Sequence, residues 1–381
     1  WVTHGGEKEL DERLCIRPTS ETLFSDYYHE VVKSYKDLPL KYNQWCNVMR
    51  WEKEARPFLR GREFFWQEGH TVHATQEEAE CETKNMLEIY KNFFEEYLAI
   101  PVLTGRKTEK EKFAGAEYTL TVESLMYNGV SLQSGTSHYF GQKFSKAYDI
   151  KFVNKENKFE YAYQTSWGVS NRMIGALIMV HGDDHGLILP PKIAPMQVAI
   201  IKATQDEATA NMAKQIMEKL TFANISSYID ETDKTFGYKL SEAEVNGIPV
   251  RIELGKRDIE NQKITISRRD TLEKAEISLS EDIVVYIEKL MSEIQNNLYN
   301  RAKTRRDSMT YHANTIEEIK SIMEKQPGFI YAPWCGDTDC ELKMKEIKGL
   351  KSRCITEDNE KSRCPICGKK SKYTVVWGIQ Y

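Results

Sequence analysis

The sequence lacks the features that mark membrane proteins, secreted proteins and strongly basic nucleic-acid binders. No unbroken apolar run is long enough to cross a bilayer, and no basic segment followed by an apolar core forms a signal peptide. The formal net charge of −4 excludes binding to a nucleic acid through the overall field, so such contact requires local patches. We therefore expect a cytoplasmic protein without a membrane partner.

Cysteine is sparse before residue 330. Cys15, Cys46 and Cys81 stand alone among segments with regular patterns. Isolated thiols of this kind are most often small, buried, apolar side chains, and we expect that of these three.

The C-terminal segment holds the other cysteines, which are Cys335, Cys340, Cys354, Cys364 and Cys367. Two short-spaced pairs separated by roughly two dozen residues suit a tetrahedral site with four cysteine ligands, which binds structural zinc. Disulfides are the alternative, and a reducing cytosol disfavours them. We expect zinc on Cys335, Cys340, Cys364 and Cys367, with Cys354 left over.

The chain has 381 residues, of which 40% are hydrophobic and 29% charged, so it can form two or three soluble domains. A proline-rich boundary lies at residues 189–195. After it, strand-like runs alternate with helical stretches up to residue 267, which predicts a mostly parallel α/β domain. A helix over 283–301 follows. It leads into a basic patch, either a solvated helix end or a nucleic-acid contact, formed by Arg301, Lys303, Arg305 and Arg306.

Two aromatic-rich runs of alternating residues, 47–52 and 63–70, flank a basic loop that contains proline and glycine. This pattern predicts an antiparallel hairpin. Residues two apart share one face of a strand, which groups Arg50, Glu52, Phe64, Trp66, Glu68 and His70. Guanidinium groups bind phosphate oxygens and rings stack on bases, so this face suits a nucleotide. An exposed hairpin with charges on its wet side is the alternative.

Three further segments place polar residues beside regular elements. Residues 17–21 open a helical pattern, where Thr19 and Glu21 are either helix-start residues or ligand contacts. Residues 132–138 predict a strand that leaves a glycine turn, and 149–153 and 160–167 predict two more strands of an antiparallel sheet. Arg172 opens an apolar helix over 173–180 and would present a fixed planar cation to an anion.

These four segments together resemble the class II aminoacyl-tRNA synthetases, in the form found in prolyl-tRNA synthetases of the archaeal and eukaryotic-like type. Residues 50–70 resemble motif 2, and residues 166–190 resemble motif 3. The C-terminal cysteine pairs and a final tyrosine, here Tyr381, resemble the zinc domain appended in that type. There the terminal carboxylate reaches back towards the active site.

The resemblance implies an α+β fold in three parts. Residues 1–192 would form the class II antiparallel sheet flanked by helices, and residues 193–295 an α/β anticodon-binding domain. Residues 296–381 would form a small α+β zinc-binding domain. Motif 1, which forms the dimer interface in the family, has no counterpart here, so we expect upstream sequence to be missing. A homodimer is then implied by resemblance alone.

The same resemblance implies a proline–tRNA ligase whose partners are L-proline, ATP with Mg²⁺, and tRNA(Pro). ATP would contact Arg50, Glu52, Arg60, Phe64, Gln133, Thr136 and Arg172, of which Arg50 and Arg172 are the expected catalytic residues. The proline pocket would comprise Thr19, Glu21, Arg50, Trp66, Glu68, His70, His138, Trp167 and Gly168. No general base is required, which agrees with the lack of an obvious Ser-His-Asp set.

The positions that match the family's anticodon readers are Leu240, Glu244 and Arg251. Acids and guanidiniums read exposed base edges, so the charged pair fits this role. The family often has an aromatic where Leu240 stands, and Arg251 also fits the polar face of any strand.

Two other functions remain open on the sequence. A sister synthetase for threonine or serine is one, although the threonine enzymes hold a metal through Cys and His, and motif 2 here offers no matching Cys. The other is a catalytically silent tRNA-binding relative. Intact Arg50 and Arg172 argue against it, because a binding module has no need of paired phosphate clamps.

Overall fold

The computed structural model describes all 381 residues, and they form two compact units. The first unit comprises Trp1–Asn92, Val102–Ala176 and Ser308–Tyr381. The second comprises Phe93–Pro101 and Leu177–Asp307. No helix combines the length and the apolar character that a membrane crossing requires.

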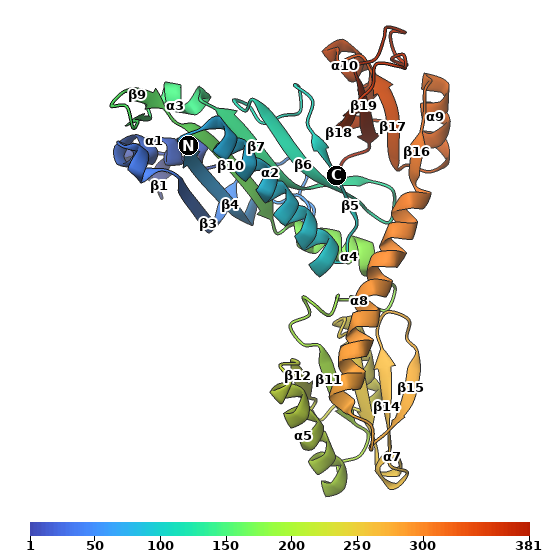
Figure 1. Ribbon diagram of the computed structural model, residues 1–381. Helices are drawn as coiled ribbons and strands as arrows, with labels where there is room; N and C mark the ends of the chain where they lie inside the picture. The colour runs from blue at the N-terminus through green and yellow to red at the C-terminus, as the bar shows by residue number, and fades with distance from the viewer. The chain divides into compact units, whose positions relative to one another are not determined.

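A ten-stranded sheet forms the centre of the first unit, in the order β16-β17-β19-β18-β5-β6-β7-β10-β4-β3 (Figure 1). Its strands are β3 (Leu40–Met49), β4 (Glu63–His73), β5 (Val102–Arg106), β6 (Tyr118–Leu125), β7 (Ser131–Gly141), β10 (Tyr163–Ser170), β16 (Thr310–His312), β17 (Phe329–Trp334), β18 (Lys351–Asp358) and β19 (Tyr373–Gly378). Neighbours are antiparallel except β16 and β17.

The predicted hairpin is present as β3 and β4, which pair from Leu40 opposite Val72 to Met49 opposite Glu63. The first strand ends at Met49, so the expectation that Arg50 and Glu52 lie within it was wrong. Beyond Met49 one backbone bond between the two segments remains, from the Arg50 N–H to the Arg62 carbonyl at 2.8 Å, and side chains bind other carbonyls nearby. The Arg50 guanidinium donates to the Pro18 carbonyl, and the Arg62 guanidinium donates to the Glu52 carbonyl.

Helices cover this sheet. Helix α2 (Gln76–Asn92) packs against β6, β7 and β10, and the hydroxyl of Thr75 accepts the Glu78 N–H at its start. Helix α1 (Glu21–Val31) packs against β4, where the buried Tyr28 hydroxyl donates to the His70 carbonyl at 2.6 Å. The short helices η1 (Tyr35–Asp37) and α3 (Lys143–Ala147) complete this part.

Residues 132–138 form no glycine turn, contrary to the sequence expectation, because β7 runs through them without a break. Gly135 is needed for close packing instead: a Cβ there would lie 2.9 Å from a methyl group of Val169. The expected strands at 149–153 and 160–167 divide between two sheets. Strands β8 (Lys151–Val153) and β9 (Phe159–Tyr161) pair only with each other, whereas β10 joins the main sheet.

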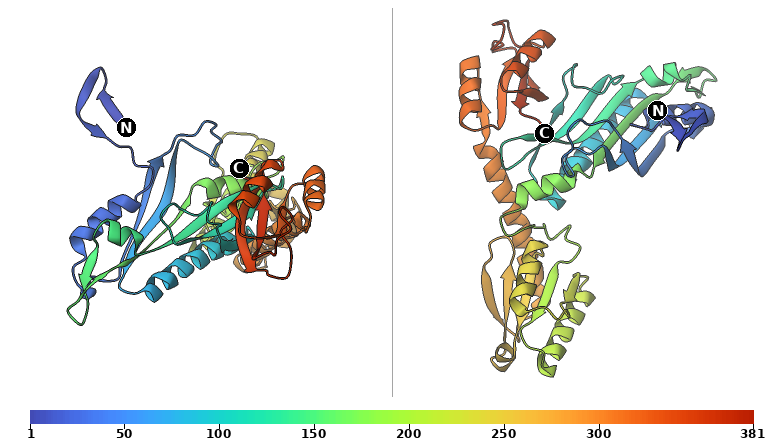
Figure 2. Two further views of the ribbon diagram at one scale, coloured as in Figure 1. Left: turned by 90° about the horizontal axis from the view of Figure 1, so that it is seen from above. Right: turned by 180° about the vertical axis from the view of Figure 1, so that it is seen from behind.

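An N-terminal hairpin of β1 (Val2–Gly5) and β2 (Lys8–Leu14) stands away from the main sheet in the left view of Figure 2. Its side chains are almost all exposed.

The C-terminal segment joins the same sheet through the contact between β18 and β5. Ile355 pairs with Arg106, and a Cβ on Gly105 would lie 2.5 Å from the Ile355 carbonyl oxygen. This close approach requires a glycine. Helices α9 (Ile316–Lys325) and α10 (Thr338–Glu346) belong to this segment, and its core includes the buried Trp334 and Trp377.

The second unit contains a five-stranded sheet in the order β12-β11-β13-β14-β15. Its elements are η2 (Phe93–Tyr97), β11 (Val198–Lys202), α5 (Glu207–Phe222), β12 (Ser227–Ile229), α6 (Phe236–Val245), β13 (Val250–Leu254), α7 (Lys256–Glu260), β14 (Lys263–Arg268), β15 (Lys274–Ser278) and α8 (Ile283–Ser308). Strands β12, β11 and β13 are parallel, but β14 and β15 are antiparallel to their neighbours. The prediction of a mostly parallel sheet was therefore only half right, since the connection through α7 is too short for a parallel crossover.

Candidate active site

A cavity of about 250 Å³ lies in the first unit where β4, β10, β7 and β6 run side by side. Almost every residue predicted for proline or ATP lines it: Thr19, Glu21, Arg50, Phe64, Trp66, Glu68, His70, Gln133, Thr136, His138, Trp167, Gly168 and Arg172. Strand pairing explains this, because Glu68 lies opposite Gly168, and Thr136 lies opposite Gly168 on the other side.

Glu68 is the most enclosed acid of the cavity, with 3% of its surface exposed. One carboxylate oxygen accepts from Ser20 and Gln44, and the other lies 3.0 Å from the imidazole of His70. Burial alone raises the pKa of Glu68, but the bonds from His70, Ser20 and Gln44 outweigh it and hold the pKa below its usual range. The cavity therefore contains a fixed carboxylate that stays ionised.

Glu21 supplies a second buried carboxylate at the first turn of α1. Its two oxygens accept hydroxyl hydrogens from Thr19 and Ser166. Neither donor is charged, so these bonds leave the negative charge of Glu21 available to a cation in the cavity.

Arg50 and Arg172 bring positive charge to the same space. The Arg50 guanidinium lies over the rings of Phe64 and Trp66, at 5.6 and 5.2 Å from their centroids. Arg172 begins α4 (Arg172–His181) and donates to the carbonyls of Leu59 and Gln133. These contacts fix both side chains before any ligand binds.

His138 and Trp167 form the apolar part of the wall. The His138 ring lies 4.9 Å from Phe113 and 2.8 Å from the Thr119 hydroxyl, and its enclosure lowers its pKa to about 3. His138 is therefore neutral at neutral pH. Trp167 packs directly on Gly69, where an added Cβ would lie 2.0 Å from the indole ring.

Glu52 and Arg60 are the two predicted ATP contacts that do not line the cavity. The Arg60 guanidinium lies 3.5 Å from Glu52 and donates to the backbone carbonyl of Tyr381 at 2.8 Å. The Tyr381 hydroxyl accepts from Asn128, and Arg56 lies over its ring. The last residue therefore lies against the loop of the β3–β4 hairpin.

Several lining residues escaped the sequence reasoning: Lys107, Glu111, Phe113, Thr119, Ser134, Gly135, Ser166, Val169 and Ser170. Five of them, Ser134, Gly135, Ser166, Val169 and Ser170, lie inside or beside the motif segments, so extending those segments by strand periodicity would have found them. Lys107, Glu111 and Phe113 lie in a loop between β5 and β6 that carries no recognisable signal.

The structure brings the three predicted anticodon residues together. Arg251 donates to the Leu240 carbonyl, to Glu244 and to Glu253, and it is 7% exposed. Glu244 and Arg251 line a small hollow of about 60 Å³, and Leu240 does not. Leu240 instead packs into a cluster around Ala199 and Ile201.

The residues of the predicted basic patch belong to α8, and their side chains bind backbone carbonyls or one acid. Arg301 donates to the carbonyls of Asp270 and His181, and Arg305 donates to that of Val180. Lys303 and Arg306 both contact Asp307, so this end of the helix is not an open basic patch.

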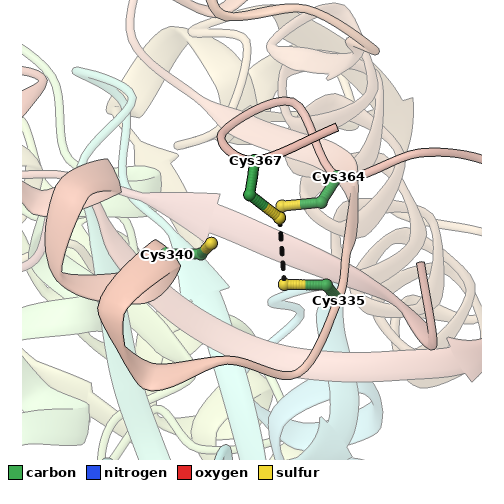
Figure 3. Close-up of side chains that lie close together, drawn as sticks. All are labelled: Cys335, Cys340, Cys364 and Cys367. Carbon is green, nitrogen blue, oxygen red and sulfur yellow. Dashed lines mark hydrogen bonds between the residues drawn. The ribbon is translucent and has the colours of Figure 1, made fainter. Parts of the chain in front are cut away.

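Four sulfur atoms converge in the C-terminal segment, from Cys335, Cys340, Cys364 and Cys367 (Figure 3). All lie within 4.8 Å of one another, and the sulfurs of Cys335 and Cys367 are 3.7 Å apart. Tetrahedral zinc with Zn–S bonds of about 2.3 Å separates its ligands by about 3.8 Å, so the four thiols fit that ion. The Lys369 N–H lowers the pKa of Cys367 to about 7, which favours the thiolate.

The burial of the other four cysteines differs in part from the expectation based on the sequence. Cys15 and Cys81 are exposed and Cys46 is half-buried, so the prediction of three buried thiols was wrong. Cys15 follows the end of β2, Cys81 lies on the exposed side of α2, and the Cys46 sulfur accepts from the Trp66 indole N–H. Cys354 is outside the sulfur cluster and fully buried against Gly105.

Comparison with known proteins agrees with this geometry. Residues 3–181 match the family described as tRNA synthetase class II core domain (G, H, P, S and T), and residues 197–297 match the anticodon binding domain. The chain is therefore a class II aminoacyl-tRNA synthetase by fold. Residues 316–381 match the family described as prolyl-tRNA synthetase, C-terminal.

Whole-chain relatives narrow the assignment. The proline–tRNA ligase of Clostridium novyi (strain NT) is 52% identical over 385 residues, which cover all of this chain and 80% of that protein. The proline–tRNA ligase of Lachnoclostridium phytofermentans is also 52% identical, over 384 residues and with the same coverage. The chain belongs to the prolyl-tRNA synthetase family.

Proposed function

We propose that this protein activates L-proline with ATP and transfers it to tRNA(Pro). The carboxylate of proline attacks the α-phosphate of ATP and displaces pyrophosphate, which gives prolyl-adenylate. The terminal ribose of the tRNA then takes the acyl group and releases AMP. Such chemistry depends on positioning and on charge neutralisation rather than on a covalent nucleophile.

One observation carries this proposal: fixed carboxylates and fixed guanidiniums line a single cavity. Glu68 and Glu21 are ion partners for the ammonium group of proline, and Arg50 and Arg172 are partners for phosphate and carboxylate oxygens. Phe64 supplies a face for adenine. Arg60 and Glu52 would contact ATP when it binds, and Mg²⁺ bound with the ATP would neutralise part of the phosphate charge.

The amino-acid end of the cavity suits a small apolar ring. Trp66, Trp167 and His138 surround it, and His138 is held neutral. No cysteine lines the cavity, which argues against the metal-dependent threonine site considered on the sequence.

The other parts of the proposal rest on separate features. Structural zinc is assigned to the four cysteines because their spacing fits it. Anticodon contact is assigned to Glu244 and Arg251, beside Leu240, because they flank a hollow on the second unit. We keep the expected domains, at 1–192, 193–295 and 296–381, and a cytoplasmic location as part of the proposal.

A homodimer is also proposed. Strand β3 is an open edge of the sheet, and the aromatic side chains of Trp45 and Trp51 near it are 76% and 82% exposed. A second chain would cover such a surface. Sedimentation velocity tests this: a monomer at micromolar concentration would contradict it.

The decisive experiment is exchange of labelled pyrophosphate into ATP, scanned over all twenty amino acids. We expect exchange that requires proline and that falls by about 100-fold or more in Arg50→Ala, because one preorganised donor at developing charge is worth that much. Lys84→Ala, an exposed cation on α2, is the control. A folded, zinc-loaded protein that exchanges with no amino acid would leave only the silent tRNA-binding relative.

A further inference from the structure

A buried group of charges closes the cavity on the side of the C-terminal segment. Lys107, Glu123 and Arg353 are 4%, 0% and 1% exposed. The Lys107 ammonium donates to one oxygen of Glu123 at 2.7 Å, and the Arg353 guanidinium donates twice to the other, at 3.0 and 2.7 Å. The Thr121 hydroxyl also donates to Glu123. The residue that follows β5 and a residue of β18 thus meet at one carboxylate of β6.

This group carries a surplus positive charge, since two cations share one acid. Cys354 does not balance it, because burial raises the pKa of its thiol to about 12 and keeps it neutral. The nearby buried Glu341 is bound by the hydroxyls of Thr108 and Ser352 instead. An unbalanced buried charge is costly, and an anionic ligand would relieve that cost.

Lys107 is the member that faces the cavity. An ammonium group has three hydrogens, and Glu123 takes one of them. The charge of Lys107 helps to lower the pKa of His138, and the charge of its partner Glu123 opposes the lowering of the Arg172 pKa, and both His138 and Arg172 line the same cavity.

We propose that Lys107 is a further substrate-contacting residue, which donates to a phosphate oxygen of ATP, and that Glu123 and Arg353 position it. This rests on the proposed function and adds to it a contribution from the C-terminal segment, since Arg353 lies on β18. The ammonium is fixed in advance, so it neutralises phosphate charge without reorganisation.

Kinetics of the exchange reaction test the contact. Lys107→Met keeps most of the side-chain volume and leaves the Arg353–Glu123 pair intact. We expect the KM for ATP to rise by about tenfold or more, as for loss of a charge-assisted hydrogen bond, with the KM for proline within twofold of its original value. Lys110→Met, an exposed lysine of the same loop, should change neither.

The positioning role is tested through β18. Arg353→Met should raise the KM for ATP by a smaller factor and add less than its full effect to Lys107→Met, and Arg353→Lys should restore part of the loss. Full additivity, or a folded Lys107→Met protein whose KM for ATP equals that of Lys110→Met, would overturn the proposal. A rise in the KM for proline alone would overturn it too.

A second measurement needs no variant and no turnover. Wild-type protein is acetylated briefly with acetic anhydride, and the modified fraction of Lys107 is measured by peptide mass spectrometry. We expect magnesium ATP to protect Lys107 at least threefold, while Lys110 is unaffected. Absent protection, or no labelling of Lys107 at all, contradicts the contact. Failure of the proposed function would appear separately, as wild-type protein that gives no proline-dependent exchange.

Discussion

At the scale of single residues, the cavity is defined by groups whose charge is set before a ligand arrives. Ser20, Gln44 and His70 hold Glu68 ionised, and enclosure holds His138 neutral. We therefore expect the secondary ammonium group of proline to meet a permanent anion on one wall and an uncharged ring on another. The anion suits the ammonium group that every amino acid carries, and the uncharged wall suits a compact apolar side chain.

Replacing Glu68 by Gln should weaken proline binding specifically. The substitution keeps the shape but removes a buried charge, and we expect the KM for proline to rise by about 10- to 100-fold, the usual value of a hydrogen bond to a charged group. The KM for ATP should stay within twofold. Steady-state exchange kinetics measure both. Glu63→Gln, at the exposed end of the same strand, is the control, and equal effects of the two variants would contradict the role.

Gly69 offers a second test at this scale. A methyl group there would lie 2.0 Å from the Trp167 ring, so Gly69→Ala must displace that ring, which lines the cavity. We expect a clear rise in the KM for proline together with a lower melting temperature. Gly237→Ala is the matched control, because its added methyl meets nothing within 4 Å. A Gly69→Ala protein with unchanged kinetics would show that Trp167 does not shape the pocket.

At the scale of elements, helix α4 begins at Arg172 and ends at His181. The His181 imidazole is 1% exposed and bonds to the Leu98 carbonyl at 2.8 Å. Burial lowers the pKa of His181 to about 4, the bond to Leu98 opposes this, and the nearby Arg301 and Arg305 add to it. The end of this helix is thus packed around a neutral histidine.

This arrangement predicts a pH dependence of stability. The folded pKa of His181 lies below the unfolded value of about 6.5, so the unfolded chain binds more protons between these values. Stability should therefore fall as the pH drops from about 7 towards 4, by at most about 1.4 kcal/mol per pH unit.

Hydrogen exchange of α8 amides reports the stability of the second unit. As the pH drops from 7 to 5, we expect the protection of these amides to fall less in His181→Gln than in the wild-type protein. Glutamine stays neutral over this range and keeps a donor for the Leu98 carbonyl. His312→Gln, in the first unit, should show the same fall as the wild-type protein. An identical slope in all three proteins would refute the assignment.

Elements set by local pattern were predictable, and those set by distant contacts were not. The hairpin of β3 and β4 and the helix after Arg172 follow from periodicity, and the resemblance placed most of the cavity wall. The unbroken course of β7 could not be read, because Gly135 resembles a turn residue until Val169 packs against it. Lys107 was also not predicted, because its role depends on contacts with Glu123 and Arg353, which are distant in sequence.

At the scale of the whole molecule, one sheet carries both the cavity and the cysteine cluster. Strand β18 pairs with β5 on one side and with β19 on the other, and Arg353 of β18 reaches Glu123 beside the cavity. Cys335 directly follows β17 and Cys364 comes after β18, so the sulfur cluster links the ends of these two strands. We therefore expect order at the sulfur cluster to support order at Lys107.

Loss of zinc should consequently affect catalysis as well as stability. Structural zinc contributes folding free energy directly, and we expect chelation or Cys364→Ser to lower the melting temperature of the first unit by about 10 °C or more. Proline-dependent exchange should fall in parallel, because β18 would no longer hold Arg353 against Glu123. Zinc content, melting temperature and exchange rate are measured on the same samples. Cys81→Ser, an exposed cysteine on α2, should keep all three. A zinc-free protein that melts and exchanges like the loaded one would show that the cavity does not depend on the cluster.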